Sequence, residues 1–108
     1  MLAERTNERN WLTLFIIFLR FAHGKRRAGD FMTAHDEWIR RGLDEGVFLL
    51  VASLQPGLGG AVVAHNTTRA ALLERVHRDP FVAHDVVTAE LLELSPSKAD
   101  PRMAFLLA

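Results

Sequence analysis

Cysteine is absent from this sequence of 108 residues. The chain therefore forms no disulfide and uses no thiol nucleophile, and we predict a reducing, cytoplasmic location. An excess of charge is absent too, because 13 Lys and Arg balance 13 Asp and Glu. Since a nucleic-acid binder usually carries a basic surface, we expect no nucleic-acid partner. The short basic run at Lys25, Arg26 and Arg27 is interpreted as a solvated loop.

A long apolar run is also missing. The stretch "WLTLFIIFL" (11–19) is about half the ~20 residues that a membrane-spanning helix needs. Arg5 and Arg9 before it imitate the start of a secretory signal, but Glu4 and Glu8 dilute their charge. We expect neither a membrane span nor a signal peptide here, and we interpret the run as a buried strand.

Motifs for metals and cofactors are not present. The five histidines show none of the close pair spacings of metal-binding helices. The glycines of "PGLGG" do not form the dinucleotide-binding pattern and are interpreted as turn geometry. Ser53 lacks the flanking glycines of a nucleophile elbow. We therefore expect no metal, no cofactor and no serine nucleophile.

The hydrophobic pattern predicts one domain with alternating strands and helices. Strands are expected at 11–21, 47–54, 61–65 and 86–94, and helices at 31–45 and from Asn66, Thr67 or Thr68 to Pro80. The order strand, helix, strand, strand, helix, strand is typical of the α+β ferredoxin-like βαββαβ fold, with an antiparallel sheet and two helices on one face. We divide the chain into an N-terminal extension (1–10), an α+β domain (11–97) and a C-terminal tail (98–108).

The first strand is apolar on both sides. Its two alternating sets are Leu12, Leu14, Ile16 and Phe18, and Phe15, Ile17, Leu19 and Phe21. Because two helices cover only one face of a sheet, the open face predicts a homodimer that packs sheet against sheet. The second-ranked alternative is cover by the chain's own tail, which Pro96 and Pro101 interrupt.

His35 and Asp79 are the candidate chemical groups. His35 lies on the apolar stripe of the first helix, and Asp79 stands before Pro80 at the expected end of the second. A carboxylate at a helix C-terminus is disfavoured by about 0.3–1 kcal/mol, and proline holds the preceding residue extended. If the helices lie side by side, the carboxylate fixes one ring nitrogen and leaves the other free for a proton. The alternative is an ion pair with a structural role only.

Ser53 interrupts the apolar second strand near its end. Its hydroxyl is expected either to polarise or orient a ligand in a cleft, or to bond to nearby backbone.

The motifs "AHDEWIRRGLDEGVFLLVASLQPGLGG", "RDPFVAHDVV" and "ELSPSKADP", in this order, resemble the YCII-related (YciI-like) family of the dimeric α+β barrel superfamily. The resemblance implies a homodimeric barrel with His35 and Asp79 as an active-site pair. It covers 11–97 and implies proton transfer on a small cyclic molecule, by isomerisation or by dehydrochlorinase-like elimination.

The resulting hypothesis is a cofactor-free lyase or isomerase whose cleft, lined by Ser53, Trp38 and Phe81, holds a compact ligand. The alternatives are a small-molecule-binding or accessory protein without turnover, and a barrel that serves only for dimerisation.

Overall fold

The computed structural model describes residues 13–107. Its elements are β1 (Leu14–Phe21), η1 (Lys25–Arg27), α2 (Ala28–Asp44), β2 (Phe48–Leu54), β3 (Gly59–Ala64), α3 (Arg69–His77), α4 (Pro80–Ala83), β4 (Val87–Leu94) and η2 (Pro101–Leu107). The strands form one antiparallel sheet in the order β2-β3-β1-β4. This is the predicted ferredoxin-like α+β fold, which is confirmed. The predicted extension 1–10 lies outside the described residues, and the domain limits stay predictions.

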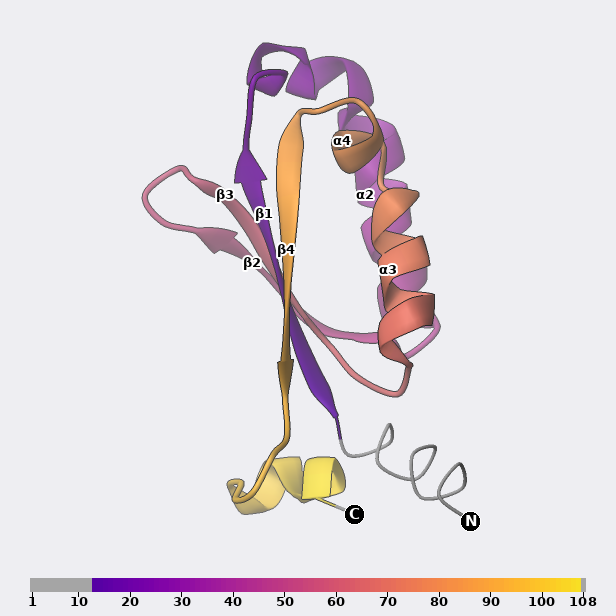
Figure 1. Cartoon of the computed structure of the whole chain (residues 1–108), viewed down its shortest axis with the longest axis vertical. Helices are drawn as coiled ribbons and strands as arrows, with labels where there is room; N and C mark the ends of the chain where they lie inside the picture. Colours follow the sequence, from indigo (N-terminus) through magenta and orange to yellow (C-terminus); the bar gives the residue numbers. More distant parts are fainter. Residues whose placement is uncertain (1–12, 108) are drawn as a thin grey trace.

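The helices α2, α3 and α4 lie on one face of the sheet (Figure 1). On this helix side the buried core consists mainly of Phe15, Ile17, Leu19, Val62 and Ala64 from the central strands, and Trp38, Leu72, Val76 and Phe81 from the helices. Gly42 allows α2 to pack closely on β2, because a Cβ atom there would lie 2.1 Å from the ring of Phe48. The predicted helical cover of a single face is therefore present.

The basic run after β1 is a turn of 3-10 helix rather than the predicted loop. Its residues are exposed, as expected, but η1 leads directly into α2, which begins at Ala28 instead of the predicted Phe31. The cations of Lys25 and Arg27 lie 4.9 and 5.2 Å from the ring centres of Phe21 and Phe31. These contacts with aromatic rings hold the segment against the domain.

The second helical region ends earlier than predicted. Thr68, one of the three predicted caps, accepts a hydrogen bond from the Ala71 N–H at 3.1 Å. The helix α3 ends at His77, however, and Pro80 begins α4 instead of ending a long helix. A proline is favourable at the first position of a helix because no intrahelical partner exists there for its missing N–H.

The open face of the sheet is the side away from the helices, and it carries the other set of β1 side chains, including Ile16 and Phe18. Leu50 and Leu92 on this side are 57% and 40% exposed. The C-terminal η2 lies beyond the end of the sheet instead of over this face (Figure 1), where Phe105 meets the ring of His65 edge-on at 5.7 Å. Within residues 13–107, no helix is long and apolar enough to cross a membrane.

Candidate functional site

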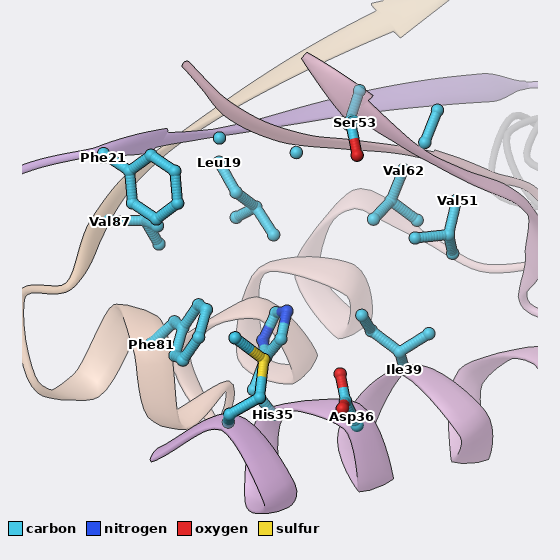
Figure 2. Close-up of a pocket in the computed structure, with 15 residues that line it drawn as sticks. Leu19, Phe21, His35, Asp36, Ile39, Val51, Ser53, Val62, Phe81 and Val87 are labelled. Atoms are coloured by element: carbon cyan, nitrogen blue, oxygen red, sulfur yellow. The ribbon is translucent and has the colours of Figure 1, made fainter. Parts of the chain in front are cut away.

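A pocket of about 390 Å³ lies between α2 and the helix side of the sheet (Figure 2). This volume is in the range of small-molecule sites. The walls are largely apolar, with three polar side chains among them. The lining residues are Leu19, Phe21, Met32, His35, Asp36, Ile39, Val51, Ala52, Ser53, Gly59, Gly60, Ala61, Val62, Phe81 and Val87.

Small residues keep the sheet wall of the pocket open. Gly60 pairs with Leu19 on one neighbouring strand and with Ser53 on the other. A Cβ atom at Gly60 would have only the Ala52 carbonyl oxygen nearby, at 3.4 Å, so a longer side chain there would extend into the pocket. The prediction of turn geometry suits Gly57 and Gly59, whose φ angles are positive. Gly60 has a different role, because its missing side chain provides space.

His35 and Asp79 are brought together at the inner wall of this pocket. The distance from His35 Nδ1 to Asp79 Oδ1 is 2.7 Å. Asp79 is completely buried, whereas a small edge of His35 faces the pocket. Their elements, α2 and α4, pack against each other although the two residues are 44 positions apart.

The position of Asp79 corrects one expectation. We predicted an unfavourable carboxylate at the C-terminal end of a helix, but Asp79 is the N-cap of α4, and its Oδ1 accepts a hydrogen bond from the Phe81 N–H at 3.1 Å. The predicted extended backbone before Pro80 is present, with φ −62° and ψ 123°. The cap therefore stabilises the carboxylate in the orientation that meets His35.

The imidazole is held in one plane. It stacks on the ring of Phe81, with centroids 3.9 Å apart and planes 3° from parallel. When Nδ1–H donates to Asp79, the neutral ring carries its lone pair on Nε2. Among the described residues, Nε2 has no hydrogen-bond partner, and Figure 2 shows the ring facing the pocket. The free nitrogen is thus available to a molecule bound there.

The second oxygen of Asp79 is less satisfied. Oδ2 is buried and has no hydrogen-bond partner in the described part of the chain. A buried carboxylate needs compensation, and the side chain placed to provide it is the imidazole of His35. The hydrogen bonds with His35 and with the Phe81 N–H therefore hold the carboxylate of Asp79 in the interior.

Two of the three predicted ligand-contacting residues line the pocket, and one does not. Ser53 and Phe81 are lining residues. Trp38 lies behind the pocket, where its indole N–H donates to the Arg75 carbonyl at 2.8 Å and its ring packs edge-on against Phe48. Trp38 therefore joins α2 to α3, so its predicted place in the cleft is not supported by the pocket's lining.

The sequence interpretation did not include Asp36, which contributes a carboxylate to the α2 wall. Its position next to His35 was the available signal, but a residue at the edge of an apolar stripe usually faces solvent. Within residues 13–107, no group of three or more His, Asp or Glu side chains is placed to hold a metal ion.

Comparison with known proteins identifies relatives by structure alone. No family model matches the sequence, and no curated protein matches it. A solved structure of 5-chloro-2-hydroxyhydroquinone dehydrochlorinase from Burkholderia phenoliruptrix, in complex with 2,5-dihydroxybenzoquinone, is similar with a TM-score of 0.61 at 12% identity. The alignment covers 80% of this chain and 95% of the dehydrochlorinase.

Two further structures resemble the chain. A transcriptional regulator from Neisseria meningitidis in complex with L-Met has a TM-score of 0.54 at 17% identity, over 87% of this chain and 56% of the regulator. A cofactor-independent oxygenase from Streptomyces nogalater has a TM-score of 0.46 at 12% identity, over 82% and 96% of the two chains. At these identities the likeness concerns the fold alone, which here is a four-stranded antiparallel sheet with helices on one face.

Proposed function

We propose that this protein is a small enzyme that needs no cofactor, in which His35 transfers a proton on a small cyclic molecule and Asp79 orients its ring. The observation that carries the proposal is the 2.7 Å contact between His35 Nδ1 and Asp79 Oδ1 at the wall of a pocket of about 390 Å³. A histidine held by a carboxylate, with its other nitrogen open to a cavity, is suited to general acid–base catalysis.

The proposed reaction is an elimination or an isomerisation. In an elimination, Nε2 of His35 takes a proton from a carbon or a hydroxyl of the ring, and the electron pair left behind forms a new double bond. The bond to the leaving group breaks with its electrons, for example to release chloride. In an isomerisation, the imidazolium returns the proton to another atom of the same ring. Asp79 supports the charge on the imidazole in both cases, and the hydroxyl of Ser53 orients an oxygen of the substrate.

The resemblance to the YCII-related family and the fold of the dehydrochlorinase support this chemistry. Membership in that family, and the cytoplasmic location expected from the cysteine-free composition, are part of the proposal.

A homodimer is proposed through the open face of the sheet. Exposed leucines on this face, among them Leu50 and Leu92, would be buried by the same face of a second copy. Sedimentation tests this part of the proposal. A folded species that stays at 12.1 kDa at micromolar concentration contradicts it.

Catalysis is tested by two readouts with matched variants. NMR in heavy water follows proton exchange on a panel of hydroxylated cyclic molecules, and an ion-selective electrode follows chloride release from 5-chloro-2-hydroxyhydroquinone. For any molecule that the wild-type protein converts, we expect His35→Gln to lower the rate by about 10²–10⁴-fold. The control is His77→Gln, which changes an exposed histidine of α3 and should leave the rate unchanged.

A different outcome supports the alternative function. If the wild-type protein binds such rings but catalyses neither exchange nor release, and His35→Gln binds them equally well, the protein is a small-molecule-binding or accessory protein.

A further inference from the structure

The ionisable groups of the pocket are unbalanced. Within residues 13–107, the lining of the pocket includes the carboxylate of Asp36 and the imidazole of His35 but no lysine or arginine. Figure 2 shows the carboxylate of Asp36 on the helix wall and the hydroxyl of Ser53 on the sheet wall, each directed into the space between them. A bound ring would therefore meet polar groups on two opposite sides.

The charge of Asp36 is not neutralised by its own helix. Arg40, one turn after Asp36, instead contacts Glu37 at 3.2 Å and Asp44 at 3.7 Å. Arg41 also pairs with Glu37, at 3.4 Å. Within residues 13–107 no ion pair involves Asp36. The arginines of α2 are thus engaged on the outer surface, and the unpaired carboxylate of Asp36, which is exposed to solvent, borders the pocket at its open edge.

We infer that Asp36 determines the charge preference of the pocket, which accepts neutral rings that carry hydroxyl or amide N–H donors and rejects rings that carry a carboxylate. The inference rests on the proposed function for the location of the site. An ionised Asp36 accepts hydrogen bonds but donates none, and a hydrogen bond to a charged acceptor is stronger than a neutral one. Ser53 accepts or donates, so it suits a hydroxyl on the opposite edge of the ring.

A carboxylate in the same place meets like charge. It would lose part of its hydration inside largely apolar walls and would find no lysine or arginine among the lining residues. Repulsion from Asp36 adds to this loss. Repulsion between two carboxylates thus discriminates between ligands that differ in charge but are nearly identical in shape.

Lys25 provides the competing possibility. Its ammonium lies 4.9 Å from the ring centre of Phe21, which lines the pocket. This contact places a cation beside one wall of the pocket. If this lysine could turn to a bound anion, carboxylates would be accepted in spite of Asp36. The substitution Lys25→Gln separates the two effects.

The test compares two ligands that differ in charge and hardly in shape, 2,5-dihydroxybenzamide and 2,5-dihydroxybenzoate. Isothermal titration calorimetry of the full-length protein at pH 7.5 and low salt measures both affinities. We expect the amide to bind about tenfold more tightly than the carboxylate, and Asp36→Asn to remove most of this difference by strengthening benzoate binding about tenfold. Added salt should narrow the difference in the wild-type protein.

Two control variants make the result specific. Asp30→Asn makes the same substitution near the start of α2, at an exposed residue outside the lining that pairs with neither arginine of the helix, and should keep the preference. Lys25→Gln should keep it as well. Equal affinities in the wild-type protein, tighter benzoate binding, or an equal effect of Asp30→Asn would overturn the inference, as would the absence of binding by both ligands at their solubility limits.

Failure of this inference and failure of the proposed function are distinguishable. Calorimetry requires no turnover, so a protein that prefers the amide but catalyses no proton exchange retains the charge preference and loses the enzymatic role. A protein that exchanges protons on such rings, in a manner that depends on His35, but binds amide and carboxylate equally retains the enzymatic role and loses the role of Asp36.

Discussion

The two sides of the sheet are built from the same strands but have different surroundings. On the helix side, Ile17 is completely buried under the protein's own helices. On the open face, its neighbour Ile16 belongs to an apolar surface on which Leu50 is 57% exposed. The helix side also holds the buried polar pair and the pocket. Apolar side chains at alternating positions therefore specify a sheet whose faces are covered, whereas the rest of the chain determines what covers each face.

The largest expected effect comes from a pair of identical substitutions on adjacent residues. Ile17→Ala should lower the free energy of unfolding by about 2–5 kcal/mol, because it leaves a cavity in the packed core. Ile16→Ala should cost about 1 kcal/mol in the monomer, because this side chain is only half-buried. Urea unfolding followed by circular dichroism measures both.

Protein concentration sharpens this first comparison. If the open face is covered by a second copy, the cost of Ile16→Ala rises with concentration, whereas the cost of Ile17→Ala is largely set within one protomer. Equal costs for the two variants at every concentration would mean that the two sides are equally covered, and the contrast between them would be wrong.

The polar pair of the helix side should have the next largest effect. Asp79→Ala removes the cap of α4 and the partner of His35, and we expect a loss of about 2–4 kcal/mol from the two contributions. The matched control is Asp44→Ala, which removes an exposed ion pair with Arg40 and should cost about 0.3–0.5 kcal/mol. Thermal and urea unfolding compare the two.

A double-mutant cycle assigns the effect to the pair. Asp79→Ala and His35→Phe, alone and together, should show a coupling energy of about 0.5–3 kcal/mol. Phenylalanine keeps a ring against Phe81, so lost stacking contributes little. If the two costs simply add, the two side chains contribute independently and the cap alone explains the position of Asp79.

The element order could be predicted because hydrophobic patterns of strands and helices are local. The failures occurred where one residue type has two opposite uses. Pro80 ends one helix and begins another with equal ease, and its neighbours decide which. Basic residues such as Lys25 favour solvent, but an aromatic ring close in space also attracts them. Such contacts depend on the folded arrangement and leave no period in the sequence.

The site could be predicted only in part for a similar reason. An apolar stripe shows that His35 and Trp38 point inward, yet not whether each meets a cavity or another helix. The structure gives His35 to the pocket and Trp38 to the contact with α3. Asp36 and Gly60 were missed because one lies at the edge of the stripe and the other contributes the absence of a side chain.

A smaller effect on stability is expected from a charge on the open face. Leu50→Lys should change the unfolding free energy of the monomer by about 0.5 kcal/mol or less, because the side chain is mostly exposed. It should nevertheless weaken self-association by about 100-fold, since a symmetric dimer contains the change twice. Leu43→Lys, on the exposed surface of α2, is the control and should leave sedimentation unchanged. Dimers that tolerate Leu50→Lys would place the interface elsewhere.

The smallest effect concerns the C-terminal segment, which belongs to neither side of the sheet. Hydrogen bonds from the side chain and the backbone N–H of Arg102 lower the pKa of the Asp100 carboxyl from its ordinary 3.8. Because the pKa is lowered in the folded state, this contact stabilises the fold when the pH is above the ordinary pKa of the carboxyl. The stabilisation is lost as the pH falls through the folded-state pKa. Arg102→Gln should therefore raise the pKa of Asp100 toward 3.8, as NMR titration would show.

Because the pair is local, the methyl signals of Ile17 and Leu92 should not follow this titration. If those of Leu92 do, the tail is coupled to the open face, and the contrast between the two sides must include it.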